Sequence, residues 1–428
     1  MLRSFLFLLA LLTLAARAVA APLDPVLLND ALWTQPRDAF MESAKALGFT
    51  WTSQAKDSAR AAEPEMTLLG QNTVECVARF QGETLQEVTV VFYARGDAGD
   101  LTEEKFDGLV RSSCEALNQA TKVKFVPRGR DQTNAVKAEG LVWTLPTRRY
   151  LLEYSKVREV KTMRIPFRAE FVRLAILPSE KKVDLATRIQ EAPKGKFTGT
   201  EHVKRDATTG DVWIGDVPMV DQGQKGYCVV AATERVMRYY GTAVDANELA
   251  QVANASGENG TSYAAMFEAL KKLSARFKVR VREVEKTDIN DVLKMITEYN
   301  RAARRAKVDP IPEQGNMIDL GEVYAAMKPE VLKEMRTKSP GDLNRFQKSI
   351  ADRVEKGIPL LWTVMLGKIP EKGIPQDAGG HMRLLIGYNA KTSEVLFSDT
   401  WGAGHELKRM ALADAWTMTT GTMSIEPI

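Results

Sequence analysis

Hydrophobic and polar residues alternate along much of the first half of the chain. Val88, Val90 and Phe92 are an example, and a two-residue period predicts a strand with one buried face. Runs of this kind predict strands at 74–80, 86–94, 140–145, 149–157 and 167–177. Helical spacing appears instead at 38–47 and 102–120. The pattern is typical of an α+β domain with a mostly antiparallel sheet.

A different composition begins at Pro178. Residues 178–210 are charged, basic and poor in large apolar side chains, which favours a linker or an extended strap over the surface. The domain before this stretch, residues 21–177, contains no histidine, no glycine-rich phosphate loop and no paired-acid motif. The sequence therefore predicts a fold for the first domain but no chemistry.

A short apolar run at 217–220 opens the second half and is expected to be a strand. It leads into a glycine-bearing loop, residues 221–227, and Cys228 follows directly. From Cys228 onward the apolar positions recur at helical spacing until Gly241, which is a common helix terminator. The pattern thus places a cysteine at the first position of a helix.

Three apolar runs near the C-terminus, at 358–366, 381–387 and 394–399, are predicted to pair as an antiparallel meander. Before them lies a helical stretch, about 287–350, with a cluster of basic residues that includes Arg301. These helices have either ordinary solvated faces or a functional role, as a lid or as a contact for an acidic substrate.

The first twenty residues have the pattern of a secretory signal peptide. A short positive start is followed by an apolar run from Phe5 to Ala16, and Ala18-Val19-Ala20 supplies the small residues of a cleavage site. Twelve helical residues rise about 18 Å, less than a bilayer core of about 30 Å, which argues against an uncleaved anchor. We expect removal of 1–20 and an exported protein, periplasmic or secreted, without an integral membrane segment.

Composition and charge argue against several classes of binding partner. The 428 residues are enough for two or three domains of about 150 residues each. The net charge at pH 7 is +4, and Arg3 and Arg17 in the signal segment supply two of those charges. A balance this close to neutral argues against binding to nucleic acid or to an anionic membrane surface. The three histidines and the cysteines do not have zinc-ligand spacing, so neither a metal nor another cofactor is expected.

Export changes how the three cysteines are interpreted. Cys76 and Cys114 lie in the same N-terminal region, whereas Cys228 lies far from both. In an oxidising compartment the simplest pairing is a Cys76–Cys114 disulfide, which would close a loop of about 40 residues and add roughly 4 kcal/mol in the chain-entropy model. Cys228 would then be a free thiol, either buried and inert or reactive.

The position of Cys228 favours reactivity. At a helix N-terminus the free N–H groups and the macrodipole stabilise a thiolate. A thiolate nucleophile needs a base, and of the three histidines His202 lies in the linker and His405 in a turn, whereas His381 begins a strand. Asp399 ends the next strand, which runs the other way, so an Asp399–His381 hydrogen bond is expected.

Two neighbours of this set have further possible roles. Gln222 precedes Cys228 by six residues and can place its amide beside the Cys228 N–H as an oxyanion hole. Trp401 follows Asp399 closely, and either shields the Asp399–His381 pair from water or fills the core.

The motifs around Gln222 and Cys228, at Gly380–Tyr388 and at Val395–Asp399 together resemble those of the papain-like cysteine peptidases. The most similar branch is the double-glycine leader peptidase domain of bacteriocin exporters, with its free-standing relatives. The resemblance implies an oxyanion donor at Gln222, a nucleophile at Cys228, a base and acid at His381 and an orienting residue at Asp399. Val229 and Val230 depart from it, because family members often have Gly-Pro there.

We therefore expect an α+β protein with a papain-like domain over residues 211–428. In that domain a helix carrying the cysteine packs on an antiparallel sheet carrying the histidine and the aspartate. The expected activity is hydrolysis of peptide or isopeptide bonds in a peptide or protein substrate. A transglutaminase-like amide acyltransferase and a non-catalytic peptide-binding module on the same scaffold are the alternatives.

Overall fold

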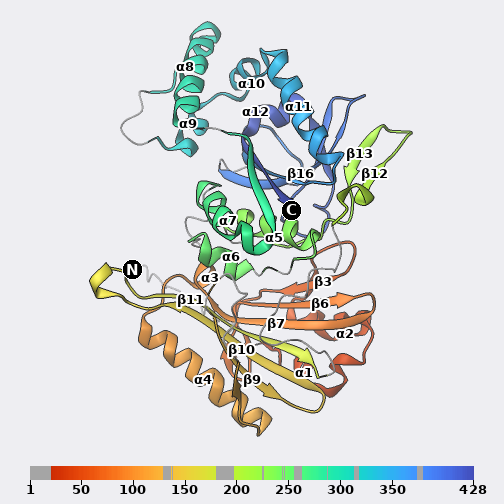
Figure 1. Cartoon of the computed structure of the whole chain (residues 1–428), viewed down its shortest axis with the longest axis vertical. Helices are drawn as coiled ribbons and strands as arrows, with labels where there is room; N and C mark the ends of the chain where they lie inside the picture. Colours follow the sequence, from red (N-terminus) through yellow and green to blue (C-terminus); the bar gives the residue numbers. More distant parts are fainter. Residues whose placement is uncertain are drawn as a thin grey trace, which may run out of the picture.

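The computed structural model has two lobes, an N-terminal one drawn in red to yellow and a C-terminal one in green to blue (Figure 1). The predicted signal segment, residues 1–20, lies outside the described residues. The structure describes residues 21–128, 136, 138–179, 197–223, 226–242, 244, 246–254, 263–286, 288–312, 318–373 and 379–428.

An antiparallel sheet forms the N-terminal lobe, with the order β2-β3-β6-β7-β11-β10-β9-β8 among the described residues. Five of these strands follow the predicted runs to within two residues. The strands are β2 (Thr50–Trp51), β3 (Ser58–Ala61), β6 (Glu75–Gln81), β7 (Thr84–Ala94), β8 (Val126–Pro127), β9 (Glu139–Thr144), β10 (Arg148–Val157) and β11 (Arg168–Pro178). A small sheet of β1 (Ala21–Pro22), β4 (Met66–Leu68) and β5 (Gln71–Asn72) adds to the lobe.

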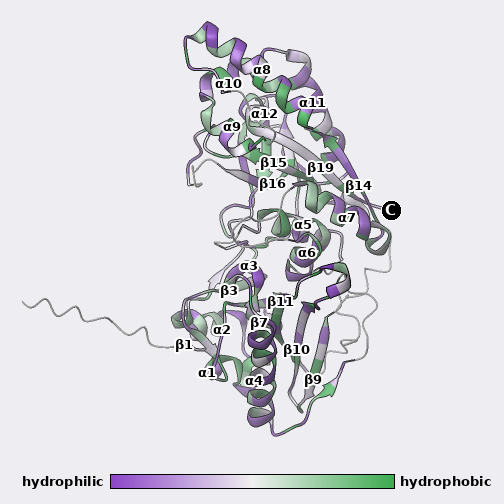
Figure 2. Cartoon of the chain, turned by 90° about the vertical axis from the view of Figure 1, so that its left-hand side faces the viewer, coloured by the Kyte–Doolittle hydropathy of each residue, from purple (hydrophilic) through white to green (hydrophobic). Residues whose placement is uncertain are grey.

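Helix α4 (Glu103–Thr121) covers part of this sheet. The Thr102 side chain caps it by accepting from the Lys105 N–H, and its buried face packs Phe106 edge-on against Tyr93. Both polar and apolar colours run along it in Figure 2, as an amphipathic helix requires. The lobe also contains α1 (Asp24–Leu27), α2 (Arg37–Ala44), α3 (Arg95–Ala98) and the short 3-10 turns η1 (Asp30–Trp33), η2 (Lys45–Leu47) and η3 (Lys161–Met163).

The predicted disulfide is absent from the structure, in which Cys76, Cys114 and Cys228 are all free thiols. Cys76 is buried in β6. Cys114 of α4 packs against the same apolar core, but the two sulfur atoms are not bonded to each other. Burial raises the pKa of the Cys76 thiol, and it raises that of Cys114 to about 11. Both side chains therefore act as small neutral core residues.

A second antiparallel sheet forms the C-terminal lobe, with the order β12-β13-β16-β15-β19-β14 and with β17 and β18 beside β16. The predicted meander is present as β15, β16 and β17. The strands are β12 (Val203–Arg205), β13 (Asp211–Ile214), β14 (Val279–Glu285), β15 (Leu360–Met365), β16 (Gly380–Asn389), β17 (Glu394–Ser398), β18 (Lys408–Ala411) and β19 (Thr419–Pro427).

One local prediction for this lobe was wrong. Residues 217–220 form no strand, because the Pro218 carbonyl accepts a hydrogen bond from the Arg235 side chain, 2.8 Å away, instead of one from a neighbouring strand. Residues 180–196 of the predicted linker lie outside the described residues, and residues 203–205 pair with β13 as the edge strand β12. The basic stretch thus contributes to the second sheet before β13 begins.

Helices pack around this sheet and lengthen the lobe at one end (Figure 1). Helices α8, α9 and α10 share a small apolar core of their own. Arg301, Arg304 and Arg305 of α8 are exposed, in agreement with a solvated helix face. The helices are α5 (Cys228–Tyr239), α6 (Ala246–Val252), α7 (Tyr263–Phe277), α8 (Ile289–Ala306), α9 (Leu320–Ala326), α10 (Pro329–Thr337), α11 (Pro340–Val354) and α12 (Leu412–Met418), with the turn η4 (Gly199–His202).

In the part of the chain that the structure describes, every helix is too short or too polar to span a membrane.

Candidate active site

Cys228 is the first residue of α5, as the sequence predicts, and its side chain is half-buried. The following helical turns are strongly apolar, and Val230 and Val236 are completely buried in the core of the lobe. This burial fixes the helix axis, so the amino end of α5 and the cysteine have a fixed place. At that end the N–H groups of the first turn have no partner within the helix and favour negative charge on the sulfur.

His381 and Asp399 come from adjacent antiparallel strands. His381 lies at the start of β16 and Asp399 directly follows β17, and the register Leu384–Ser398 sets the two ends near each other. His381 Nε2 lies 2.6 Å from Asp399 Oδ1. The Cys228 side chain is a second hydrogen-bonding partner of the imidazole and favours its protonated form. The structure therefore brings the three predicted residues into one hydrogen-bonded series.

These contacts shift the protonation of His381. Burial lowers its pKa, but the hydrogen bonds and charges of Asp399 and Cys228 outweigh burial and raise the pKa to about 9. His381 is only 6% exposed and Asp399 is fully buried, so water screens their interaction weakly. The arrangement favours an imidazolium at neutral pH.

A wall of aromatic and turn residues closes one side of this pair. The Trp401 ring stacks on the His381 ring with centroids 4.3 Å apart and planes 3° from parallel. His405 contacts Trp401 edge-on, and its backbone oxygen accepts a hydrogen bond from the Asp399 N–H at 2.8 Å. Trp401 thus covers the imidazole, and His405 belongs to the turn that supports Asp399.

Arg383 holds the second carboxylate oxygen of Asp399. Its Nε lies 2.7 Å from Asp399 Oδ2, and its other nitrogens pair with Glu371 at 3.0 and 3.1 Å. Burial raises the pKa of Asp399, but the His381 hydrogen bond, the charge of Arg383 and the Thr400 N–H lower it below its usual value. Sequence reasoning missed Arg383, although an arginine two residues after His381 on an apolar strand shares its face of the sheet.

A second buried arginine, also missed, connects α5 to the strand end. Arg235 is completely buried and donates to the Asp399 backbone oxygen at 2.6 Å and to Ser398 Oγ at 2.5 Å. It also donates to the Pro218 oxygen at 2.8 Å. Burial lowers the pKa of this guanidinium to about 10. Arg235 therefore joins the helix that carries Cys228 to the strand end that carries Asp399.

Gln222 lies in the loop before Cys228, and Thr400 holds it. The Gln222 N–H donates to the Thr400 oxygen at 2.9 Å, and the Thr400 hydroxyl donates to the Gln222 side-chain oxygen. Gln222 is 9% exposed. These bonds orient the amide with its oxygen toward Thr400 and its –NH₂ group away from Thr400.

Residues 309–424 match the model of a family described as Peptidase_C39 like. The matched segment contains His381 and Asp399 but begins after Gln222 and Cys228. The match supports a papain-like cysteine peptidase family and suggests a cysteine peptidase-like fold. No curated protein matches the chain. Among the described residues, no group of three His, Cys, Asp or Glu side chains is arranged to hold a metal ion.

The raised pKa of His381 predicts a titration well above that of an ordinary histidine. We expect the His381 ring signals in an NMR titration to move with a midpoint near pH 9, because Asp399 and Cys228 both stabilise the imidazolium. In Cys228→Ala the midpoint should fall, since one of the two partners is lost. A midpoint at or below 6.5 in the unaltered protein would contradict the geometry.

The same shift links stability to pH. Because the folded-state pKa is raised, the protonated imidazolium contributes stability that is fully present below about pH 6.5 and is lost as the pH rises through about 9. The free energy of unfolding is therefore expected to decline between these values, as measured by urea denaturation.

Proposed function

We propose that the protein is an exported cysteine peptidase that hydrolyses peptide or isopeptide bonds. One observation carries this proposal: the hydrogen-bonded series from the Cys228 thiol through His381 to Asp399, assembled from α5, β16 and the end of β17. The series lies at a helix N-terminus and includes a half-buried sulfur, as a nucleophile that must meet a substrate requires.

In the proposed reaction the Cys228 thiolate attacks the carbonyl carbon and a carbon–sulfur bond forms. The tetrahedral intermediate collapses as the carbon–nitrogen bond breaks and the His381 imidazolium donates its proton to the leaving amine. Neutral His381 then removes a proton from water, which attacks the thioester. The carboxylic acid leaves, and Cys228 and His381 return to their starting state. Asp399 keeps the imidazole oriented throughout.

Gln222 is the proposed oxyanion donor, together with the Cys228 backbone N–H. The paired bonds between Gln222 and Thr400 support this role, because they fix an amide in the loop that leads to the nucleophile. A preorganised donor of this kind is typically worth about 3–4 kcal/mol in the transition state. It acts without a reorganisation step, since the loop already holds it.

The signal-like pattern at 1–20 supports export to the periplasm or the medium. The proposed substrates are peptides or proteins, and the similarity of residues 309–424 to a peptidase family supports this class.

The test combines labelling with product analysis on the purified full chain. A thiol-reactive epoxide at pH 7 is expected to modify Cys228 and to leave Cys76 and Cys114 unmodified, because burial raises the pKa of both thiols. A peptide library should then be cleaved without any added amine. Products formed only in the presence of an amine would indicate acyl transfer instead, and an unreactive Cys228 without cleavage would indicate a binding module.

A further inference from the structure

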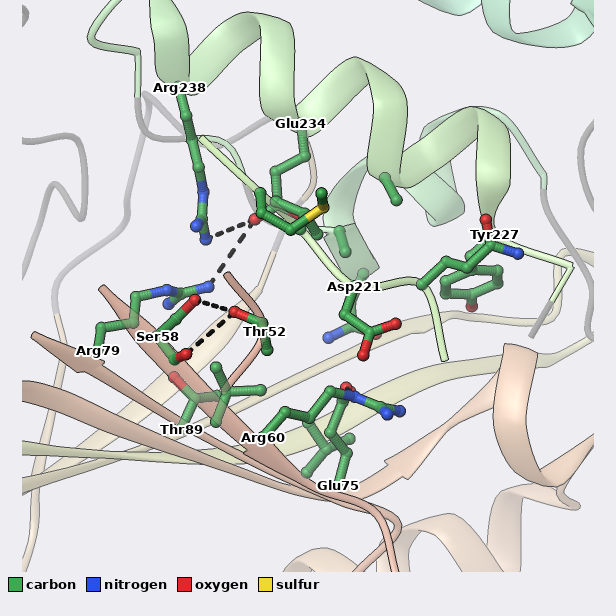
Figure 3. A pocket seen from close by; sticks show the side chains of 18 residues that line it. Thr52, Ser58, Arg60, Glu75, Arg79, Thr89, Asp221, Tyr227, Glu234 and Arg238 are labelled. Atoms are coloured by element: carbon green, nitrogen blue, oxygen red, sulfur yellow. Dashed lines mark hydrogen bonds and ion pairs between the residues drawn. The ribbon is translucent and has the colours of Figure 1, made fainter. Parts of the chain in front are cut away.

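The helix that begins at Cys228 rests on the N-terminal lobe. Figure 3 shows a pocket between the two lobes, with α5 above the strands of the first sheet. Tyr227, Ala231, Glu234 and Arg238 line it from the upper side, at the spacing of one helical face. Glu234 is 2% exposed and lies 3.8 Å from Arg79 of β6 and 2.5 Å from Arg238. One face of α5 is thus buried against the other lobe.

Tyr227, the residue directly before Cys228, packs on a glycine of the N-terminal lobe. A Cβ atom at Gly96 would lie 1.8 Å from the Tyr227 hydroxyl oxygen and 2.2 Å from the ring carbon that carries it. Gly96 is buried in the short helix α3, and Tyr227 is 5% exposed. Such a close approach requires a residue without a side chain. The phenol therefore fits against bare backbone.

Other parts of the N-terminal lobe contact the loops on either side of the site. The Arg60 guanidinium, paired with Glu75, lies against Gly223, where a Cβ would come within 2.4 Å of Nη2. The Gln54 N–H donates to Glu406 at 2.8 Å. Gly223 belongs to the loop of Gln222 and Cys228, and Glu406 to the turn that follows Asp399. Both loops that carry the proposed machinery are supported from outside their own lobe.

From these contacts we infer that the N-terminal lobe is a positioning part of the catalytic centre, and that Gly96 and Tyr227 form the contact through which it holds the amino end of α5. The inference rests on the proposed function and assigns to the first domain a role that its sequence does not indicate. It predicts that the lobe is not a removable inhibitory segment, because Arg60 supports Gly223 in the loop of Gln222 and Cys228.

Gly96→Ala in the full chain tests this contact. The added methyl group would displace Tyr227 and with it the residue that carries the sulfur. We expect kcat for peptide hydrolysis to fall about 10- to 100-fold with KM nearly unchanged, as a small misplacement of a reacting group produces. The rate of Cys228 alkylation by iodoacetamide should change as well, with an altered pH profile. Gly108→Ala is the matched control, because a Cβ there meets nothing within 4 Å.

A second variant removes the phenol ring of Tyr227 from the C-terminal side of the same contact. Tyr227→Leu is expected to lower kcat by a similar factor, and the double variant Gly96→Ala/Tyr227→Leu should lose little more than Tyr227→Leu alone, because both changes act on one contact. This comparison remains informative if Gly96→Ala fails to fold. Multiplicative losses in the double variant, or full kcat and unchanged alkylation in both single variants, would overturn the positioning role.

The alkylation measurement separates this inference from the proposed function. If the unaltered protein hydrolyses no peptide, the proposed function fails, yet the reactivity of Cys228 still reports whether Gly96 and Tyr227 position it. If the unaltered protein is active and the contact variants behave like Gly108→Ala, the positioning role fails and the proposed function stands.

Discussion

Cys228→Ser is expected to lower kcat/KM for peptide hydrolysis by about 10⁴-fold or more, the range seen when the nucleophile of a catalytic triad is removed. A serine hydroxyl at this position would remain protonated beside His381, so the nucleophile would be lost while the hydrogen bond could persist. The site is half-buried and the two side chains are nearly equal in size, so the thermal midpoint should change little. Steady-state hydrolysis of the best library peptide measures the effect.

Cys114→Ser is the matched control for this change. Cys114 is a half-buried cysteine in the N-terminal lobe, far along the chain from the proposed site, and its loss should leave kcat/KM within about twofold. Retention of a tenth or more of the activity in Cys228→Ser would mean that another group attacks the substrate. The hydrolytic function would then have to be assigned to a different site.

The sequence predicts strands well where their period is local. Strands β7 and β11 were found from alternation alone. A strand with one buried face has a two-residue pattern of apolar positions that can be recognised without knowing its distant contacts. Strands β14 and β19 were not found. Their pairing joins Val279 to Pro427, and nothing in either segment indicates the other. Long-range pairing is a property of the fold, not of a window of residues.

The residues of the candidate site differ in the same way. Cys228, His381 and Asp399 could be found because each lies at the end of a strong local pattern and has a reactive side chain. Arg235 and Arg383 were missed, because their partners are backbone oxygens and carboxylates supplied by other elements, although the spacing of Arg383 from His381 placed it on the same face of the sheet. The sequence shows an arginine in an apolar segment but does not indicate which buried acceptors its guanidinium will bind.

The disulfide prediction failed for a related reason. Cys76 and Cys114 share one core, but sharing a region does not fix the direction of two side chains, and a disulfide requires specific Cβ geometry. The contact between Tyr227 and Gly96 was equally invisible, since it joins two lobes across more than a hundred residues. What packs between domains depends on surfaces that exist only after each has folded.

The hydrogen bond from His381 and the charge of Arg383 explain how the Asp399 carboxylate can remain charged in the core. Asp399 is fully buried, and a lone carboxylate there would be protonated. Arg383 supplies a compensating charge on the side away from His381, and Glu371 in turn balances Arg383. Arg235 meanwhile binds the Asp399 backbone oxygen rather than the carboxylate. His381 and Arg383 therefore keep the carboxylate ionised, and the two arginines hold this residue in place without needing to contact substrate.

Asp399→Asn tests whether the carboxylate is needed for catalysis. An amide cannot stabilise the imidazolium as a carboxylate does, so we expect kcat to fall by about 10²- to 10⁴-fold. The pKa of His381 should fall from about 9, because the Asp399 carboxylate contributes most to raising it. The alkaline limb of the kcat/KM profile should therefore move to lower pH. Rate profiles between pH 5 and 10, in units of about 0.5, measure both effects.

Asp352→Asn is the control for this change, since it removes an exposed carboxylate of α11 and should alter neither the rate nor the profile. The variant at 399 leaves Arg383 with Glu371 as its acidic partner, so a lower thermal midpoint is expected beside the kinetic loss. A lower midpoint with an unchanged alkaline limb would make Asp399 a residue of the fold alone. A shifted limb in a folded variant instead requires that the carboxylate set the protonation of the imidazole that serves Cys228.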